Sequence, residues 1–420
     1  MFFLYQIIII ILVVLSPIII SIRILKKKES KKRFKEKFCF PSKKRISGNL
    51  IWFHGSSVGE TLSILPLIYE LEKNKSINQI LITSSTLSSS EIFKKFKFKK
   101  TVHQFFPLDF TLYSYKFLNY WKPTISIFVE SEIWPGIFRV LNKKSIPLIL
   151  LNARITKKTF KKWNYIKSFS NSVFKNILTA YPQNNETFNY LKKLNVSKIK
   201  RIGNLKFINN EQDKLIKLDK TLLRDFKNRK IWCASSTHPG EEIICSKVHL
   251  NLKKKYKNLL TIIIPRHIHR VNKIVKDIEY LKLNVVKHGS NMKIKKNTDI
   301  YLVDTYGETK RFYQSSNIVF MGKSLTGEGG QNPLEPTNLG STVLYGPNVD
   351  NFKDTYELLN KLKVAYKVNG VKSLTHSIDK LITNPNNKKN YLKIAKIGKK
   401  ILNETKDEIN SLFNNEIKKT

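Results

Sequence analysis

The sequence predicts an α/β protein with two doubly wound, Rossmann-like domains that face a cleft and follow an N-terminal membrane anchor. Three observations lead to this prediction. The chain has 420 residues and 41% hydrophobic content, more than one core usually serves but ordinary for two. From Leu50 onward, short β-branched or apolar runs alternate with longer amphipathic stretches, which is typical of βαβ units and parallel sheets. Residues 1–22 carry no charged side chain.

This uncharged run is long enough to cross a bilayer, which takes about 20 apolar residues. It lacks the positive start and the small-residue cleavage site of a signal peptide. Because Pro17 can kink a helix or make it re-entrant, a monotopic anchor over residues 1–25 is an alternative to a single-pass span. The anchor is followed by a group of cations that we name the basic collar: Arg23, Lys26, Lys27, Lys28, Lys31, Lys32 and Arg33.

The basic collar predicts the side of the membrane on which the rest of the chain lies. The positive-inside rule places everything after the anchor in the cytoplasm, at the inner membrane. We expect the collar to bind anionic inner-membrane lipid. The formal charge of +45, from 76 Lys and Arg against 31 Asp and Glu, attracts other anions too, including nucleic acid and phosphorylated substrates. Lysine, isoleucine and asparagine are all abundant, which also fits coding bias, so net charge alone assigns no partner.

The three cysteines form no CxxC pair and no His/Cys cluster with metal-ligand spacing. This argues against a disulfide scaffold and against a structural zinc site.

The strand and helix patterns divide the chain after the anchor into two domains, 35–208 and 230–386, joined by a Lys/Asp-rich linker over 209–229. A Lys-rich tail over 387–420 is expected to be a helix that packs across the domains. In the first domain we expect strands at 50–54, 79–83, 102–106, 124–129, 147–151, 178–181 and 198–202. In the second we expect strands at 230–234, 259–264, 299–303, 317–321 and 341–345, with helices near 239–255 and 267–281.

Residues 51–61, IWFHGSSVGET, read as a strand, a turn of small residues and the start of a helix. Gly55 and Gly59 allow a ligand to approach the backbone closely. Glu60 falls near the helix N-terminus, where the dipole favours its ionised form, and an ionised Glu there is suited to remove a proton from an acceptor hydroxyl. A simple helix cap is the alternative role for an isolated Glu at this position.

The same turn, GSSVG, also matches the G-x-S-x-G elbow of α/β serine hydrolases, with Ser57 as nucleophile. Asp304 and His376 are candidate partners downstream. The hydrolase is therefore an alternative from another class of enzyme. A binder of nucleic acid or acidic lipid, driven by charge alone, is a third, but the ordered acidic and glycine-rich loops speak against it.

Further charged residues follow other predicted strands of the first domain. In IFVESEIWPG, Glu130 and Glu132 follow a predicted strand and lie in a turn before Trp134. Acidic residues at the end of a strand point to a site and not to a core. In RIGNLKF, Lys206 leaves another predicted strand.

Four strand-end loops of the second domain favour nucleotide binding. They are ASSTHPGEE (234–242), IIIPRHIHR (262–270), DTYGE (304–308) and GKSLTGEGGQNPLEP (322–336). The first is suited to hold phosphate on helix N–H groups, and Arg266 in the second matches phosphate oxygens with its guanidinium fork. A Glu in the last loop can accept hydrogen bonds from ribose hydroxyls. No Asp-x-Asp pair is present to hold a divalent cation, which favours metal-independent chemistry.

The motifs HGSSVGE, VESEIWP, LNARIT, GNLKF, ASSTHPGEE, PRH, DTYGE, GGQNPLEP and GPNVDNFKD occur in this order along nearly the whole chain after the anchor. At these residues the sequence resembles the 3-deoxy-D-manno-octulosonic acid (Kdo) transferases of lipopolysaccharide biosynthesis. The resemblance implies a GT-B fold and an inverting, metal-independent transfer of Kdo from CMP-Kdo to a lipid A precursor, lipid IVA. It implies no cofactor and no nucleic-acid partner.

The resemblance also implies roles for particular residues. The family's catalytic base falls on Glu60, and its transition-state-stabilising positions fall on Glu130 and Lys206. The family's CMP contacts fall on Pro265, Arg266, Gly307, Glu308, Thr309, Asn332, Pro333, Leu334 and Glu335. The chain departs from the usual family pattern at Tyr306, Thr309 and Gln331. These departures put the individual nucleotide contacts in question and leave the expected class of enzyme unchanged.

Overall fold

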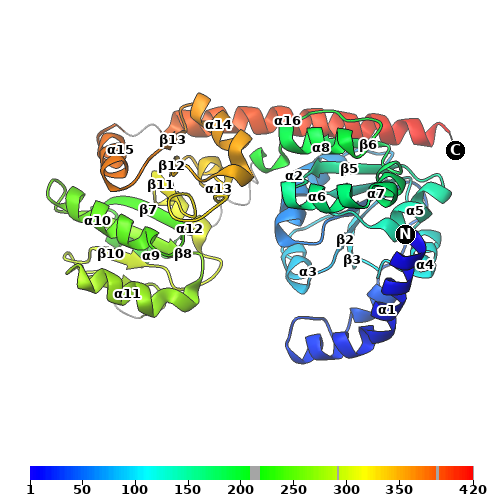
Figure 1. The fold of residues 1–420 in the computed structure, drawn as a ribbon, viewed down its shortest axis with the longest axis horizontal. Helices are drawn as coiled ribbons and strands as arrows, with labels where there is room; N and C mark the ends of the chain where they lie inside the picture. Colours follow the sequence, from blue (N-terminus) through cyan, green and yellow to red (C-terminus); the bar gives the residue numbers. More distant parts are fainter. Residues whose placement is uncertain (209–217, 291–292, 385–386, 420) are drawn as a thin grey trace. The chain divides into compact units, whose positions relative to one another are not determined.

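The computed structural model describes residues 1–208, 218–290, 293–384 and 387–419. The chain divides into two compact units. Unit 1 comprises Met1–Ile208 and Lys399–Thr420, and unit 2 comprises Asn209–Gly398. Each unit contains one parallel sheet with helices around it (Figure 1).

The sheet of unit 1 has six parallel strands in the order β3-β2-β1-β4-β5-β6. Its central strands are continuous apolar runs that are buried along their whole length, as expected where helices cover both faces. The strands are β1 (Leu50–His54), β2 (Gln79–Ser84), β3 (Thr101–Phe105), β4 (Ile125–Val129), β5 (Leu148–Ala153) and β6 (Thr179–Pro182). The helices are α2 (Val58–Leu71), α3 (Leu87–Phe93), α4 (Thr111–Trp121), α5 (Pro135–Lys143), α6 (Lys157–Tyr165), α7 (Lys167–Phe174) and α8 (Asn185–Lys193).

The sheet of unit 2 has seven parallel strands in the order β13-β12-β11-β7-β8-β10-β9. The strands are β7 (Lys230–Thr237), β8 (Leu259–Pro265), β9 (Val285–Lys287), β10 (Ile300–Leu302), β11 (Ile318–Met321), β12 (Thr342–Tyr345) and β13 (Ala365–Lys367). The helices are α9 (Lys220–Phe226), α10 (Glu241–Lys253), α11 (Val271–Tyr280), α12 (Thr309–Gln314), α13 (Leu334–Asn338), α14 (Lys353–Lys361) and α15 (Val371–Thr383).

Each unit has its own hydrophobic core. In unit 1, Trp52 on β1 packs against Phe117 of α4 and Phe128 of β4, with ring centroids 4.9 and 5.1 Å away. In unit 2, Trp232 and Ile263 belong to a separate cluster of buried side chains. The sequence-based prediction of two doubly wound α/β folds is therefore confirmed.

The structure corrects some of the predicted elements. No strand forms at 198–202, where Ile199 makes one isolated bridge to Ala180 beside the edge strand β6. Two edge strands, β9 and β13, were not predicted, because three residues are too few to show an alternating pattern. The predicted linker 209–229 contains α9, and its first part, 209–217, lies outside the described residues.

Two long helices stand at the ends of the chain. Helix α1 (Phe2–Leu25) is the one helix in the described ranges that is long and apolar enough to cross a membrane, and it continues through Pro17. Helix α16 (Asn387–Ile417) confirms that the tail is helical. It begins in unit 2, and from Lys399 onward it belongs to unit 1.

Candidate active site

The loops after β1 and β4 meet at the C-terminal edge of the unit 1 sheet. These strands are neighbours in the sheet, but the chain leaves β1 toward β2 on one side and β4 toward β5 on the other. In open parallel sheets, the crevice at such a reversal of strand order is where ligands bind. Glu60 and Glu130 both come from the segments that begin at this edge.

Glu60 lies in the first turn of α2 and forms a capping box with Ser57. The Ser57 hydroxyl accepts a hydrogen bond from the Glu60 amide at 3.3 Å, and the Glu60 carboxylate accepts one from the Ser57 amide at 3.0 Å. Burial raises the pKa of Glu60, and the negative charges of Glu132 and Glu130 raise it further, against the opposing effect of the Ser57 hydrogen bonds. A carboxylate whose pKa is shifted toward neutrality is suited to general-base catalysis.

Glu130 and Lys206 form an ion pair beside this turn, although they are far apart in the sequence. The Lys206 Nζ lies 2.6 Å from the Glu130 Oε1, and the Glu130 side chain is 7% exposed. Glu130 has a φ of 58°, an unusual conformation for a residue with a side chain, and such strain concentrates at functional sites. The structure therefore brings together two of the residues that the sequence singled out.

Lys206 is held in place by two asparagine side chains. Asn204 caps the short 3₁₀ helix Leu205–Phe207, and its Oδ1 accepts a hydrogen bond from the Lys206 amide at 2.9 Å. Asn152, at the end of β5, accepts one from the Leu205 amide at 3.1 Å. The backbone that carries Lys206 is thus fastened to the sheet edge.

Glu132 is the centre of a hydrogen-bond network that the sequence analysis did not predict. Its Oε2 accepts from the Ser56 hydroxyl at 2.5 Å, from the Trp134 indole at 2.7 Å and from the His54 imidazole at 3.0 Å. Burial alone raises the pKa of Glu132, but the hydrogen bonds from His54, Ser56 and Trp134 and the charge of His54 outweigh it, so the pKa lies below its ordinary value. Glu132 therefore joins the loops after β1 and β4.

The structure does not support the hydrolase alternative. The Ser57 hydroxyl caps α2, and in the described part of the chain no histidine contacts it. Asp304 accepts a hydrogen bond from the Gly289 amide at 2.6 Å within unit 2, and His376 lies on α15 of the same unit. The described contacts of the Ser57 hydroxyl are those of a helix cap, and none of them supplies the general base that a serine nucleophile needs.

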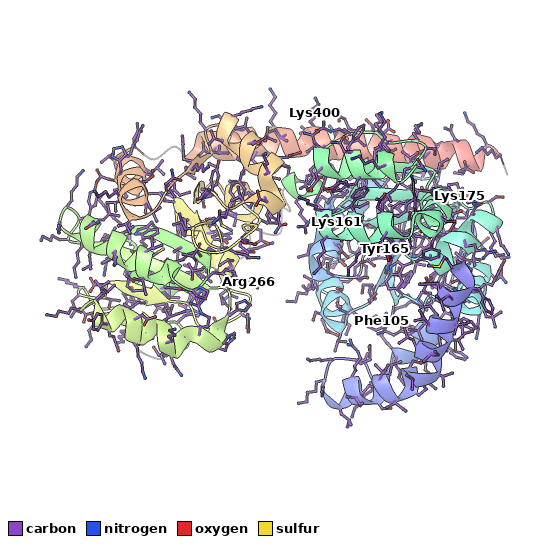
Figure 2. The ribbon with its side chains drawn as sticks, in the orientation of Figure 1. Phe105, Lys161, Tyr165, Lys175, Arg266 and Lys400 are labelled. Atoms are coloured by element: carbon purple, nitrogen blue, oxygen red, sulfur yellow. The ribbon has the colours of Figure 1, made fainter. Side chains whose placement is uncertain are left out.

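The expected nucleotide contacts of unit 2 occupy three loops at the C-terminal edge of its sheet. Arg266 is exposed directly after β8 (Figure 2), and its amide donates to the Thr237 carbonyl at 3.1 Å. Gly307, after β10, has a φ of 86° and open space where a side chain would stand. The remaining contacts are Pro265 at the end of β8, Glu308 and Thr309 at the start of α12, and Asn332, Pro333, Leu334 and Glu335 at the start of α13.

The loop ASSTHPGEE has a different role from the phosphate site that we expected. Glu241, in the first turn of α10, is fully buried, and its carboxylate accepts hydrogen bonds from four backbone amides: His238 at 2.9 Å, Lys323 at 2.7 Å, and Ser324 and Leu325 at 3.0 Å each. Glu242 binds the Arg270 guanidinium through two contacts of 3.0 Å. Two carboxylates already occupy this helix start, so it does not attract a phosphate.

A metal site is not apparent in the part of the chain that the structure describes, where no three His, Cys, Asp or Glu side chains gather in a suitable group.

Comparisons with known proteins identify the family of the chain. Residues 32–209 match the family model described as 3-deoxy-D-manno-octulosonic-acid transferase (kdotransferase). The chain is 33% identical over 407 residues to a 3-deoxy-D-manno-octulosonic acid transferase of Rickettsia bellii, covering 94% of this chain and 96% of the relative. The chain belongs to the Kdo transferase family. A Kdo transferase of Haemophilus influenzae is 30% identical over 372 residues, which cover 86% of this chain and 85% of that protein.

Solved structures confirm the fold of this Kdo transferase family member. A glycosyltransferase from Rickettsia africae superposes with a TM-score of 0.59 at 12% identity, covering 89% of this chain and 100% of that one. At such low identity the similarity establishes the fold alone, which is GT-B. Family and fold together make the protein a glycosyltransferase that transfers Kdo.

Proposed function

We propose that the protein transfers Kdo from CMP-Kdo to a lipid A precursor, lipid IVA, with inversion at the anomeric carbon and with Glu60 as the general base. The observation that carries this proposal is the half-buried Glu60 carboxylate, whose pKa is raised, at the same sheet edge as the Glu130–Lys206 ion pair. Membership of the Kdo transferase family identifies Kdo as the sugar that is transferred.

In the proposed reaction, Glu60 takes the proton of the acceptor hydroxyl. The hydroxyl oxygen attacks the anomeric carbon of Kdo from the face opposite CMP, and the bond from that carbon to the phosphate oxygen breaks. CMP leaves with the bonding electrons, so one displacement inverts the configuration. Lys206, which Glu130 orients, and Arg266 stabilise the negative charge that develops on the departing phosphate.

The proposed CMP site consists of the loops after β8, β10 and β11. Arg266 supplies a charge for the phosphate, and the bare backbone at Gly307 admits the nucleotide. The other proposed contacts are Pro265, Glu308, Thr309, Asn332, Pro333, Leu334 and Glu335. Tyr306, one of the departures from the family pattern, is 67% exposed beside them.

The proposed lipid acceptor is supported by the path from the membrane helix to the site. Lys37 follows the basic collar, and its Nζ lies 2.5 Å from the Glu29 carboxylate and 3.4 Å from the Ser85 carbonyl. The Ser85 hydroxyl lies 3.0 Å from that of Ser56, which binds Glu132. Ser85 and Ser56 thus link the segment after the collar to Glu132, which supports a site close to the membrane surface.

The direct test is to incubate the full-length protein with CMP-Kdo and lipid IVA and to read the product mass and the release of CMP. We expect Kdo adducts, with or without EDTA, because we propose that no divalent cation takes part. Glu60→Gln should lose transfer and keep CMP binding, whereas the matched change Glu70→Gln on the same helix should keep both. Folded protein that gives neither adduct nor CMP would refute the proposal.

A further inference from the structure

The first turn of α1 is fastened to unit 1. The Tyr5 hydroxyl donates a hydrogen bond to the buried Asp109 carboxylate at 2.5 Å. The Gln6 side-chain oxygen accepts from the Thr111 hydroxyl at 2.6 Å and from its amide at 3.3 Å. The Arg139 guanidinium lies 4.3 Å from the centre of the Phe2 ring. The N-terminus of the helix therefore lies on the surface of unit 1.

The other end of α1 is fastened to the same unit. Ser16 and Ile20 are only 5% and 6% exposed, although residues around them on the helix are open. In the last turn of the helix, Arg23 contacts Glu29 at 3.4 Å. Arg33 then donates to the Ser90 hydroxyl at 2.8 Å, which ties the collar to α3.

This geometry conflicts with a helix that spans the bilayer. Twenty-four residues of helix measure about 36 Å, slightly more than the roughly 30 Å of a hydrocarbon core. A spanning α1 would hold its first turn on the far side of the membrane from Glu29, and would bury Arg139 and its polar neighbours in or beyond the lipid, at high cost. Lying flat, the helix keeps unit 1 in water and presents Phe3, Leu4, Ile8, Ile11, Leu15 and Ile18, all exposed, to one leaflet.

A cation-lined cavity opens beside the first turn of α1. Its volume is about 380 Å³, and its walls include Phe2, Arg139, Lys143, Ser172, Lys175 and Asn176. Lys175 lies on unit 1 just after α7 (Figure 2). Three exposed cations line this cavity, and its described lining holds no carboxylate. Arginine and lysine are the usual partners of phosphate, and the apolar helix alongside suits an acyl chain.

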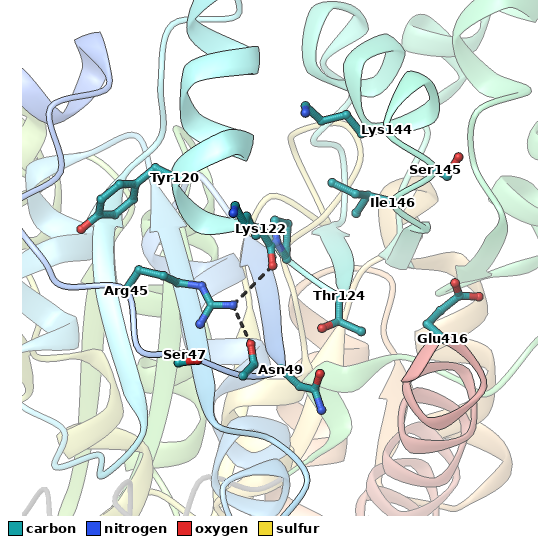
Figure 3. Close-up of a pocket in the computed structure, with 12 residues that line it drawn as sticks. Arg45, Ser47, Asn49, Tyr120, Lys122, Thr124, Lys144, Ser145, Ile146 and Glu416 are labelled. Atoms are coloured by element: carbon teal, nitrogen blue, oxygen red, sulfur yellow. Dashed lines mark hydrogen bonds between the residues drawn. The ribbon is translucent and has the colours of Figure 1, made fainter. Parts of the chain in front are cut away.

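A larger cavity of about 650 Å³ at the N-terminal edge of the unit 1 sheet is lined differently (Figure 3). There the Arg45 guanidinium donates to the carbonyls of Trp121 at 2.5 Å and Gly48 at 2.7 Å. Glu416 adds a negative charge to the wall. The Arg45 guanidinium, which is the side chain of this cavity best suited to bind phosphate, is thus already hydrogen-bonded to backbone carbonyls.

We propose that α1 lies in the plane of one leaflet, with both ends on the side of unit 1, and that the cavity beside its first turn binds the phosphate of an anionic phospholipid. The phosphate would contact Arg139, Lys143 and Lys175, and the acyl chains would follow the exposed face of α1. This headgroup site is separate from the sheet edge that holds Glu60, and it stands whether or not the acceptor is lipid IVA.

The orientation of α1 is tested with single cysteines in the full-length protein in sealed vesicles. Phe3→Cys and Leu25→Cys introduce thiols at positions 78% and 81% exposed, and the native cysteines are all buried. A membrane-impermeant maleimide should label both from the side on which the units lie. Labelling of Phe3→Cys from the opposite side alone would overturn the proposal.

If lipid shields the introduced thiols from the maleimide on both sides of the membrane, the depth of α1 in the bilayer distinguishes the two orientations. A fluorophore attached to Leu12→Cys, in the middle of α1, should be quenched by lipids labelled near the headgroup. Stronger quenching by lipids labelled at the chain ends would place Leu12 at the bilayer centre and overturn the proposal.

The headgroup site is tested by binding to vesicles that contain phosphatidylglycerol. The triple change R139Q/K143Q/K175Q should weaken binding roughly 100-fold, at about fivefold per lysine or arginine near the surface. The control K192Q/K198Q/K400Q removes the same charge from exposed positions elsewhere on unit 1 and should have little effect. An equal loss of vesicle binding in both triple variants would show that binding depends on net charge alone, and it would overturn the proposed headgroup site.

The source of the phosphate is tested by acetylation of Lys143 and Lys175. Phosphatidylglycerol vesicles should protect both lysines, and the same concentration of inorganic phosphate should not. Protection by inorganic phosphate alone would assign the cavity to a free anion and overturn the lipid assignment.

Discussion

At the scale of single residues, the Glu60 carboxylate serves both as a helix cap and as the proposed base. Its Oε2 accepts a hydrogen bond from the Ser57 amide, which completes the capping box. The neighbouring carboxylates already have partners: Glu130 pairs with Lys206, and Glu132 accepts hydrogen bonds from His54 and Ser56. Glu60 is therefore the carboxylate of the three that stays available for a proton.

The raised pKa of Glu60 predicts the pH dependence of the reaction. Because the base must be ionised, transfer should fall as the pH drops through the folded-state pKa, which lies above the ordinary value of 4.5. A pKa that is higher in the folded state stabilises the protein at low pH, and this contribution is lost as the pH rises through that pKa. The pH profile of kcat and unfolding by denaturant at each pH measure the two effects.

Glu60→Gln separates the two roles of this residue. Glutamine still caps α2, so the free energy of unfolding at pH 7 should be unchanged or higher, while transfer falls about 10²- to 10⁴-fold. Lower stability with preserved transfer would make Glu60 only a cap.

Glu241 offers a contrast, since its role is structural. In Glu241→Gln, the amide nitrogen cannot accept hydrogen bonds, so about two of the four backbone amides that Glu241 binds lose their acceptor, at about 2–4 kcal/mol of unfolding free energy. Glu328→Gln, at an exposed position of the loop whose amides Glu241 binds, is the control and should be neutral. Chemical denaturation measures both, and equal stabilities would contradict the role of Glu241.

At the scale of elements, the site depends on how β1 passes into α2. A five-residue buried strand ends at His54, and α2 starts after Ser57, so only a tight turn separates them. Glycine is favoured at position 55, because a Cβ there would stand 3.1 Å from the Glu60 Cβ, which is a tight contact. The turn that resembles a serine elbow is thus a short loop that places Glu60 at the sheet edge.

The substitution Ser57→Ala distinguishes two roles of Ser57: the N-cap of α2 and the nucleophile of a hydrolase. Loss of the N-cap should lower the unfolding free energy by about 1 kcal/mol, and transfer should stay within a few-fold. Ser57→Thr keeps a capping hydroxyl and should restore stability. Complete loss of turnover in a folded Ser57→Ala protein would contradict the cap and revive the nucleophile.

At the scale of the whole molecule, the C-terminal part of α16 completes unit 1. Ile409 and Phe413 are fully buried. Glu408 accepts a hydrogen bond from the Tyr181 hydroxyl at 3.0 Å and pairs with Lys200. The last residues of the chain therefore stabilise the unit that contains Glu60.

Phe413→Ala should destabilise unit 1 by about 3–5 kcal/mol, because it leaves a cavity in a buried site. Hydrogen exchange should quicken in β5 and β6 and stay slow in β7 and β8. Leu392→Ala, at a position of α16 that is 65% exposed, is the control. Equal loss of protection in both sheets would contradict the assignment of the tail to unit 1.

The sequence by itself determined the fold class, the family and the strand ends at which Glu60, Glu130 and Arg266 lie. These follow from local signals, namely alternating apolar runs, small-residue turns and ordered motifs, which need no knowledge of distant contacts. The edge strands β9 and β13 were not predicted, because three residues are too few to show an alternating apolar pattern.

Only the tertiary structure decided which side chains meet. His54 and Glu132 are 78 residues apart, and Tyr5 and Asp109 are 104 apart, yet each pair is hydrogen-bonded. Nothing local to α1 distinguishes a spanning helix from one that lies flat, because both need the same apolar run. The contacts at its two ends carry the proposal that it lies flat, since a helix held at both ends on one unit cannot have those ends on opposite sides of a membrane.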